Sequence, residues 1–274
     1  DGKQHFNNAR IQRLGSGEMA ILCDRLPSFD GDLRSAQTFI WHGGKEGKEW
    51  SEPTALDVWG IVPHKMLETQ SGKRIIAAHH QDEHTGKVAQ YCYISEDERK
   101  TWTKRTIASD IRYDLCEASL IEVEKDVIVA LMRENSGMGY DCMKAISYDG
   151  GWTWNGVYAM PIPGCHRPVG GFLKDGSVAI TCRFMHGGRG GFGHIFHSVF
   201  FVLTDKESLL ATHRNKQSVR IFPFDYDRSS HADTGYTGWV QLDEENIYAV
   251  NYIVDDWPRA QIRGYRIHRS DIIL

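Results

Sequence analysis

The sequence predicts an all-β fold, a β-propeller of four-stranded antiparallel blades, and three observations support it. Apolar runs rich in Val, Ile and aromatic residues alternate with turn residues along the chain, and only residues 206–213 suggest a helix. A turn motif returns at starting positions 43, 95 and 147, a spacing of 52 residues. Five pairs of polar residues recur with a separation of 15 or 16 residues. We therefore expect one domain over residues 1–274 with five blades, six being the alternative.

The strands are predicted from short apolar runs that end at Gly, Asp or Ser, residues that favour turns. The clearest runs are RIIAAH, VAQYCYIS, DVIVALMR, SVAITCRF and NIYAVNYI. The last cycle contains only three such runs. We therefore expect a short strand at residues 5–7 to complete the last blade.

The turn motif has the form S-x-D-x-G-x-T-W. It is complete in residues 147–154, whereas the copy in residues 95–102 has Arg99 in place of the glycine, and the copy that starts at Gly43 keeps only Gly47 and Trp50. The aspartate can accept backbone N–H groups across the turn, and the tryptophan can pack between sheets. We predict that these turns join the third and fourth strands of their blades.

The polar pairs mark the first two strands of each predicted blade. They are Arg10 and Arg25, His64 and His80, Glu117 and Arg133, Arg167 and Arg183, and Tyr236 and Tyr252. The start of the first strand and the end of the second lie at the same edge of an antiparallel hairpin. The first strand of a propeller blade lines the central channel, so all ten side chains are expected around one mouth of the channel, with the turn motifs on the opposite face. This concentration of Arg, His, Glu and Tyr favours a binding site.

Composition excludes several classes of function. The formal net charge of −4 argues against a nucleic-acid partner, and no apolar run reaches the length of about 20 residues that spans a bilayer. No signal peptide is visible, so we expect a soluble protein whose localisation stays open. The six cysteines lie in apolar runs without CxxC spacing, which indicates buried free thiols. We expect no cofactor and no metal, because neighbouring strand residues such as His79 and His80 face opposite ways.

The turn motif resembles the Asp-box of the sialidase superfamily, and four further segments strengthen this resemblance. The segment ARIQ at residues 9–12 is similar to the opening F/Y-R-I-P motif of that family, with Gln12 in place of proline. The segment SFDGDLRS occupies the place of the loop with the acid/base aspartate. The segments CEASLIEVEKDVIVALMRE and TGYTGWVQLDEENIYAVNY are similar to those with the buried glutamate and the nucleophilic tyrosine. The resemblance implies a single sialidase-like propeller domain.

The resemblance also implies catalytic roles. Tyr236 would be the nucleophile and Glu117 its base, and either Asp30 or Asp32 would be the acid/base, with Asp30 preferred. A neutral tyrosine can approach a substrate whose carboxylate would repel a second carboxylate, and sialidases are known for a Tyr nucleophile.

Arginines would hold the substrate, because guanidinium groups bind carboxylates bidentately. The resemblance assigns this grip to Arg10, Arg133 and Arg183. The expected substrate-binding set is completed by Arg25, Arg167, His64, His80, His166 and Tyr252.

Three functions remain open on the sequence. The first is a retaining exo-sialidase-like glycoside hydrolase that cleaves a terminal sialic acid or a related acidic sugar. The second is a lyase or hydrolase for uronate-containing glycans, in which His64, His80 or His166 acts with Tyr236. The third is a propeller that binds carbohydrate without catalysis. In each case the partner is an acidic glycan, with no nucleic acid and no membrane.

Overall fold

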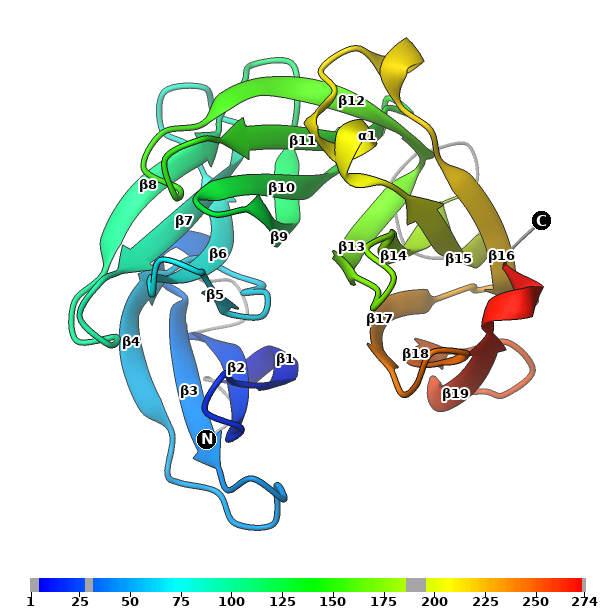
Figure 1. Cartoon of the computed structure of the whole chain (residues 1–274), viewed down its shortest axis with the longest axis horizontal. Helices are drawn as coiled ribbons and strands as arrows, with labels where there is room; N and C mark the ends of the chain where they lie inside the picture. Colours follow the sequence, from blue (N-terminus) through cyan, green and yellow to red (C-terminus); the bar gives the residue numbers. More distant parts are fainter. Residues whose placement is uncertain (1–4, 28–31, 186–195, 273–274) are drawn as a thin grey trace. The chain divides into compact units, whose positions relative to one another are not determined.

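The computed structural model describes residues 5–27, 32–185 and 196–272 (Figure 1). The chain divides into two compact units, one formed by residues 1–130 and 145–156 and the other by residues 131–144 and 157–274. Almost all regular structure is β, and the strands form five sheets in which sequential strands are neighbours. The prediction of an all-β propeller fold with five blades is confirmed, each sheet being one blade.

Four of the five sheets have four strands. The first contains β1 (His5–Arg13), β2 (Met19–Leu26), β3 (Gln37–Gly43) and β4 (Thr54–Trp59). The second contains β5 (Leu67–Glu68), β6 (Arg74–Gln81), β7 (Val88–Ser95) and β8 (Thr103–Ala108). The third contains β9 (Leu115–Glu124), β10 (Val127–Glu134), β11 (Asp141–Ser147) and β12 (Asn155–Pro163). The fourth contains β13 (Cys165–Phe172), β14 (Val178–Met185), β15 (His197–Thr204) and β16 (Arg220–Tyr226).

The fifth sheet has three strands in the described part of the chain, β17 (Thr234–Gln241), β18 (Asn246–Ile253) and β19 (Gln261–His268). The expectation that residues 5–7 complete this sheet is wrong. They form the beginning of β1, where His5 pairs with Leu26 and Asn7 with Asp24 of β2. A β-bulge between Asn7 and Arg10 interrupts the regular pairing without ending the strand, so β1 extends over nine residues.

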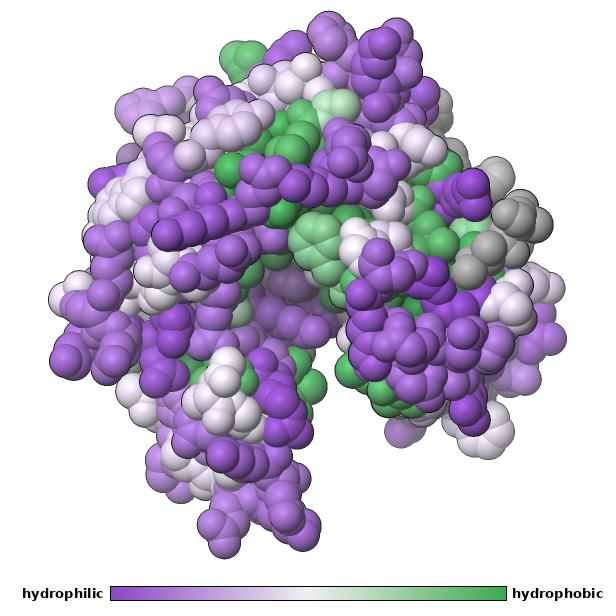
Figure 2. Space-filling view, in the orientation of Figure 1, coloured by the Kyte–Doolittle hydropathy of each residue, from purple (hydrophilic) through white to green (hydrophobic). Residues whose placement is uncertain are grey.

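The sheets are held together by apolar side chains between neighbouring blades. In β6 and β7 nearly every residue is buried, as expected for strands covered on both faces. One core cluster joins the first and second sheets through residues such as Leu22, Ile76 and Trp102. In the second unit another cluster joins the fourth and fifth sheets through Phe201 and Ala249. Much of the face in Figure 2 is hydrophilic, with hydrophobic residues in smaller areas.

The predicted turn motifs form nearly identical hydrogen-bonded loops. In the copy at residues 95–102, the Asp97 carboxylate accepts the backbone N–H of Thr101 at 2.9 Å and its hydroxyl at 2.7 Å. The Asp149 carboxylate accepts the same two groups of Thr153 at 2.9 and 2.6 Å. Because Ser95 pairs with Arg74 at the start of β6, the first of these turns lies at the edge of its sheet opposite the C-terminal end of β6.

Two smaller expectations can also be compared with the structure. All six cysteines are free and buried, which confirms the predicted state of the thiols. The helix suggested at residues 206–213 is present as α1 (Lys206–Leu210), whose N-cap Asp205 accepts the N–H of Ser208. Within the described ranges, the helices are too short or too polar to cross a membrane.

Candidate functional site

A left-handed backbone recurs at one position near the start of each sheet. The five residues are Asn8, Val62, Glu117, Arg167 and Tyr236, with φ between 52° and 58°. Non-glycine residues rarely adopt this conformation, which costs about 1–3 kcal/mol and persists where the surrounding structure enforces it. In the first, fourth and fifth sheets it falls at a β-bulge. The repetition identifies these five positions as structurally equivalent.

The second strand of each sheet contributes one further equivalent position. The residue before each left-handed residue pairs with Asp24 in the first sheet, His79 in the second, Arg183 in the fourth and Tyr252 in the fifth. The 16-residue spacing gives Arg133 as the corresponding residue of the third sheet. The structure therefore reproduces the predicted pairs in the fourth and fifth sheets.

In the first two sheets the predicted register is displaced. Arg10 and His64 stand two residues beyond the left-handed positions, which belong to Asn8 and Val62. Arg10 is close enough to Lys65 for its charge to help lower the pKa of that ammonium, although burial is the larger cause. Spacing alone could not reveal this displacement, because Asn8 and Val62 carry no ionisable side chain and the nearby Arg10 and His64 fit almost the same separation.

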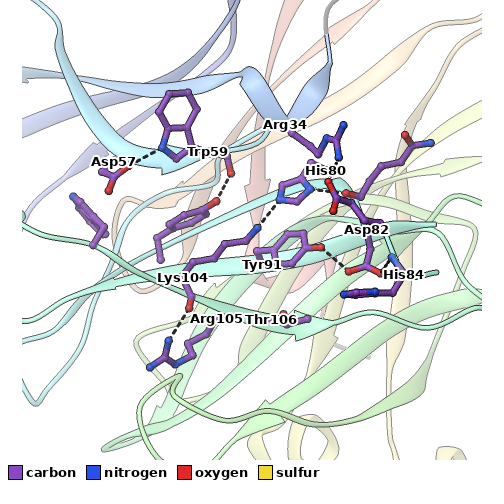
Figure 3. Close-up of a pocket in the computed structure, with 14 residues that line it drawn as sticks. Arg34, Asp57, Trp59, His80, Asp82, His84, Tyr91, Lys104, Arg105 and Thr106 are labelled. Atoms are coloured by element: carbon purple, nitrogen blue, oxygen red, sulfur yellow. Dashed lines mark hydrogen bonds and ion pairs between the residues drawn. The ribbon is translucent and has the colours of Figure 1, made fainter. Parts of the chain in front are cut away.

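Arg25 and His80 are each one residue beyond the equivalent position, so their side chains lie on the other face of the sheet. The guanidinium of Arg25 lies 4.3 Å from the centre of the Phe39 ring. The His80 ring stacks on Tyr91 with 4.2 Å between ring centres, next to Lys104 (Figure 3). The structure thus does not bring Arg25 and His80 to the predicted group of site residues.

In the second unit, Tyr236 lies at the centre of a cluster of site residues. The guanidinium carbon of Arg183 is 5.4 Å from the centre of the Tyr236 ring, and that of Arg167 is 5.6 Å away. These are distances at which a cation is attracted to an aromatic ring. The Tyr252 ring meets Tyr236 edge to face at 6.0 Å between centres. Four of the predicted residues therefore come together here.

Arg183 is almost fully buried and connects several members of this cluster. It donates to the carbonyl oxygen of Thr234 at 3.2 Å, to the Asp233 carboxylate at 3.4 Å and to Nδ1 of His166 at 3.4 Å. The Nδ1 atom of His166 accepts this hydrogen bond, so the arrangement favours the neutral imidazole.

Asp233 is a site residue that sequence reasoning missed. Its carboxylate also accepts the Tyr252 hydroxyl at 2.8 Å, so it connects Arg183 with Tyr252. Burial is the main reason why the pKa of Tyr252 is raised, and this phenol therefore stays protonated. The available signal was the position of Asp233, three residues before Tyr236 in the segment HADTGY.

His197 is a second residue that the sequence did not reveal. It is fully buried at the start of β15, and its Nδ1 accepts the N–H of Thr234 at 3.4 Å. Burial and, to a smaller extent, the charge of Arg183 lower the pKa of His197 to about 4. The imidazole is therefore neutral at physiological pH.

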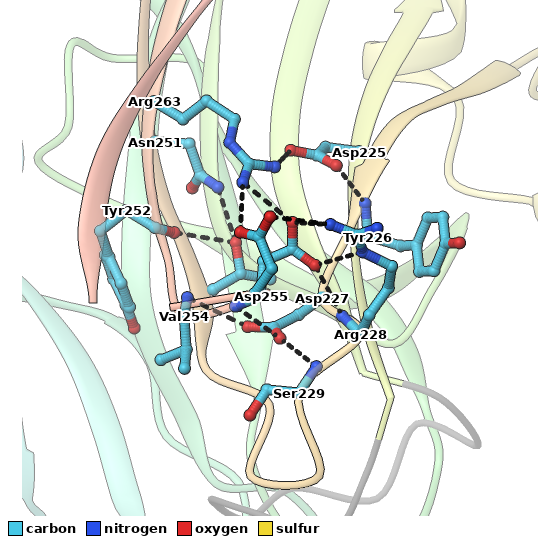
Figure 4. A network of polar contacts seen from close by, with 12 residues as sticks. Asp225, Tyr226, Asp227, Arg228, Ser229, Asn251, Tyr252, Val254, Asp255 and Arg263 are labelled. Atoms are coloured by element: carbon cyan, nitrogen blue, oxygen red, sulfur yellow. Dashed lines mark hydrogen bonds and ion pairs between the residues drawn. The ribbon is translucent and has the colours of Figure 1, made fainter. Parts of the chain in front are cut away.

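A network of carboxylates and arginines fixes the segment that leads to Tyr236 (Figure 4). The buried Asp227 carboxylate accepts the backbone N–H groups of Asp233 at 3.0 Å and Asp255 at 2.9 Å. Asp255 in turn forms ion pairs with Arg228 at 2.6 Å and Arg263 at 2.9 Å. These hydrogen bonds, led by that of Arg228, hold the pKa of Asp255 well below its usual range. The network thereby holds the backbone of Asp233 in place.

In the first unit, the equivalent positions contact one another from sheet to sheet. The N–H of Val62 donates to the buried Asp24 carboxylate at 3.2 Å, and the N–H of Glu117 donates to Nδ1 of His79 at 3.2 Å. In both cases the end of a second strand binds the left-handed residue of the next sheet. Glu117 itself is buried, with 4% of its surface exposed.

The acid/base aspartate was predicted as Asp30 or Asp32. Asp30 lies outside the described residues, as does the segment 186–195. Asp32 is the N-cap of a short 3-10 helix (Leu33–Ser35), and its carboxylate accepts the N–H of Arg34 at 2.9 Å and the side-chain Nε at 2.7 Å. The side-chain hydrogen bond is the main reason why the pKa of Asp32 is lowered. This hydrogen bonding favours the carboxylate form of Asp32, and the choice between Asp30 and Asp32 as the acid/base stays a prediction.

Two predicted groupings extend over both compact units. Tyr236 belongs to the second unit and Glu117 to the first, so their contact stays a prediction. The same holds for the grip by Arg10, Arg133 and Arg183, since only Arg10 belongs to the first unit.

The histidines of the segment HHQDEH have separate contacts. His79 binds the Glu117 N–H, whereas Nε2 of His80 accepts from the Lys104 ammonium at 2.8 Å. Over residues 5–27, 32–185 and 196–272, no group of three or more His, Cys, Asp or Glu could hold a metal ion.

The chain is similar to known proteins in its sequence family and in its fold. Residues 8–190 match the family of BNR repeat-like domains. No curated protein matches the chain significantly in sequence.

Several solved structures are similar in fold. A protein of unknown function from Dyadobacter fermentans is 18% identical with a TM-score of 0.55, over 97% of this chain and 95% of that one. The NanB sialidase of Streptococcus pneumoniae is 13% identical with a TM-score of 0.68, over 100% of this chain and 57% of that one. An α-L-arabinanase of Penicillium chrysogenum, solved with arabinobiose, is 13% identical with a TM-score of 0.62, over 94% and 80%.

The chain spans about half the length of the sialidase structures that it resembles, 57% for the NanB sialidase and 45% for the sialidase of Trypanosoma rangeli. At these identities the likeness concerns the fold alone.

Proposed function

Because this chain belongs to the family of BNR repeat-like domains, we propose that it is a glycoside hydrolase that releases a terminal sialic acid or a related acidic sugar with retention of configuration. The observation that carries the proposal is the placement of the Arg167 and Arg183 guanidinium groups 5.6 and 5.4 Å from the centre of the Tyr236 ring. The sialidase and arabinanase structures with this fold support carbohydrate as the ligand class.

The charge of this cluster suits an anionic sugar. Arg167 and Arg183 are both buried, and the low dielectric of their surroundings strengthens their attraction for a substrate carboxylate. Arginine remains charged at every relevant pH. In our proposal Arg10 and Arg133 complete the grip, and His64, His166 and Tyr252 line the site.

The reaction proceeds in two displacements. The Tyr236 hydroxyl gives its proton to Glu117 while its oxygen attacks the anomeric carbon, and the bond to the leaving oxygen breaks as that oxygen takes a proton from Asp30. Asp30 then removes a proton from water, which attacks the anomeric carbon while the Tyr236 oxygen leaves and takes its proton back from Glu117. The two inversions give retention.

The proposal is tested with a fluorogenic sialoside. We expect the purified protein to release sialic acid, and NMR of the first product should show the configuration of the substrate. Absence of release from sialosides of several linkages would reject the exo-sialidase activity.

The position of His166 favours a second candidate, a lyase for uronate glycans. His166 accepts a hydrogen bond from Arg183, which lies over Tyr236, so an arginine, an imidazole and a phenol lie in one cluster. Such a set can hold a uronate and remove the proton next to its carboxylate. An unsaturated product that absorbs in the ultraviolet would identify this reaction and exclude the first.

A further inference from the structure

A cleft lies within the first unit, between β4 and the sheet formed by β6, β7 and β8 (Figure 3). Its volume is about 730 Å³, within the range of about 300–1,000 Å³ that small-ligand sites occupy. Trp59 on β4, Tyr91 and Tyr93 on β7 and Lys104 on β8 line it. None of these residues takes part in the function proposed above.

Lys104 provides the cleft with a positive charge that forms no direct ion pair among the described residues, although the Asp82 and Glu83 carboxylates lie near enough to favour the charged ammonium. Its ammonium donates to Nε2 of His80 at 2.8 Å and lies 3.9 Å from the centre of the Tyr91 ring, and both partners are neutral groups. In the described part of the chain, Lys104 forms no ion pair with Asp or Glu. A ligand with an anionic group would supply the missing partner.

The other charges of the cleft are already paired or bonded. Arg34 forms ion pairs with Asp32 and Glu83. The Asp82 carboxylate accepts the N–H of Thr85 at 2.9 Å and the Tyr91 hydroxyl at 3.0 Å. Arg105 donates to the carbonyl oxygen of Lys104 at 2.8 Å, and its guanidinium lies 4.7 Å from the centre of the Trp152 ring. Lys104 is the cation whose charge lies over an aromatic residue that lines the cleft, Tyr91.

His80 fixes the position of this ammonium. Its Nδ1 lies 2.7 Å from the carbonyl oxygen of Gln81, so Nδ1 carries the proton and donates. The other ring nitrogen, Nε2, is then an acceptor and can bind only a donor such as the Lys104 ammonium. Burial lowers the pKa of His80 and keeps the ring neutral.

Trp59 gives the cleft a rigid aromatic wall. Its indole N–H donates to the Asp57 carboxylate at 2.6 Å, and its carbonyl oxygen accepts the Tyr93 hydroxyl at 2.7 Å. Even so, 37% of the Trp59 surface remains exposed. An aromatic side chain that is fixed and partly exposed suits the C–H face of a sugar ring, whose hydroxyl groups can bind the polar residues around it.

We propose that this cleft is a second carbohydrate site, which binds one sugar unit with a carboxylate or sulfate group. The anionic group binds the Lys104 ammonium, and the sugar ring packs against Trp59. The site is independent of the proposed hydrolase activity, because neither Lys104 nor Trp59 has a role in that reaction.

The test follows the His80 imidazole by NMR in protein with ¹⁵N-labelled histidine, with the His80 signal assigned from the His80→Gln variant. The probes are N-acetylneuraminate, glucuronate, N-acetylglucosamine 6-sulfate and neutral N-acetylglucosamine. We expect saturable shifts of His80 Nε2 with anionic sugars and about tenfold weaker binding of the neutral sugar, the factor expected for one charge-assisted hydrogen bond. Response to the sulfate or to the carboxylates alone would identify which anion the site takes.

Matched variants test the proposed contacts of the sugar with Lys104 and Trp59. Lys104→Met should weaken binding about tenfold, whereas Lys100→Met, which removes an exposed lysine away from the cleft, should leave it unchanged. Trp59→Ala should weaken anionic and neutral sugars alike. Equal binding of neutral and anionic sugars, no shift with any anionic probe, or unchanged binding in Lys104→Met would overturn the proposal.

Discussion

At the scale of single residues, the candidate site combines strained backbone with concentrated charge. Tyr236 adopts a left-handed conformation, with φ of 58°, directly beside two buried guanidinium groups. Backbone strain of this kind persists where the fold enforces it, and it gathers at functional sites. The repetition of the same conformation at Glu117 and Arg167 shows that the fold itself provides the position and that the residue placed there determines the chemistry.

Tyr236→Phe tests the assignment of the nucleophile. The variant keeps the ring and its packing but loses the oxygen, so we expect turnover of the sialoside to fall by at least about 10³-fold without loss of folding. Initial rates and a thermal melt measure the two effects. Tyr252→Phe is the matched control, since it removes the hydrogen bond to Asp233 and should reduce the rate much less. Near-normal turnover by Tyr236→Phe would remove the nucleophile assignment.

The lowered pKa of His197 predicts how the free energy of unfolding depends on pH. Its pKa is lowered from 6.5 to about 4 in the folded protein, so the unfolded chain binds more protons between these values. The contribution of His197 is therefore complete above pH 6.5 and is lost as the pH falls towards 4, by about 3 kcal/mol in total.

Urea unfolding at a series of pH values measures this effect. The His197→Gln variant keeps an acceptor for the Thr234 N–H but does not titrate, so its stability should fall less steeply over the same interval. Parallel curves for the two proteins would contradict the prediction.

At the scale of strands and turns, the same hydrogen bonds recur in the turn motifs of two sheets. The side chains of Asp97 and Asp149 bind the turn in the same way, although one motif has Arg99 where the other has Gly151. Both residues have positive φ, 76° for Arg99 and 93° for Gly151. Glycine adopts this positive φ without strain, whereas arginine adopts it with backbone strain.

Substitutions at these two equivalent positions should have opposite effects. We expect Arg99→Gly to stabilise the protein by up to about 1 kcal/mol, because it relieves the left-handed strain. Gly151→Ala should destabilise it by about 1–3 kcal/mol, since the new Cβ would adopt the strained conformation and lie 3.2 Å from Cδ1 of Ile75. Chemical denaturation of both variants measures the changes in the free energy of unfolding. Stabilisation by both substitutions, or destabilisation by both, would refute the argument.

At the scale of the whole molecule, four of the five sheets bury one or two cysteines in their strands, and the fifth sheet has none. All six cysteines are buried and free. Burial raises the pKa of Cys92 to about 12, and it is also the main reason why the pKa of Cys23 is raised to about 12. Protonated, inaccessible thiols react slowly with electrophiles.

A thiol titration tests this description of the interior. We expect essentially no reaction of the native protein with a chromogenic disulfide and reaction of six thiols after denaturation. Fewer than six thiols in the denatured, unreduced protein would reveal a disulfide.

The sequence predicted those features that local chemistry controls. Turn residues at a 52-residue spacing predicted the sheets and their loops, and the spacing of polar residues predicted Arg167, Arg183, Tyr236 and Tyr252 as one group. Each of these features depends on residues that are close in the chain, so a single sequence is enough to recognise them. The same reasoning left Asp233 and His197 unnoticed, because their importance comes from contacts with Arg183 and Thr234.

Only the tertiary structure determined the register at the strand ends. Arg10 stands two residues beyond the left-handed position of Asn8, and His80 stands one residue beyond His79, on the opposite face of β6. The same shift places His80 beside Lys104 in the cleft of the first unit. Side chains alternate at every residue of a strand, so a change of one position, which the sequence pattern does not record, decides which face a functional group occupies.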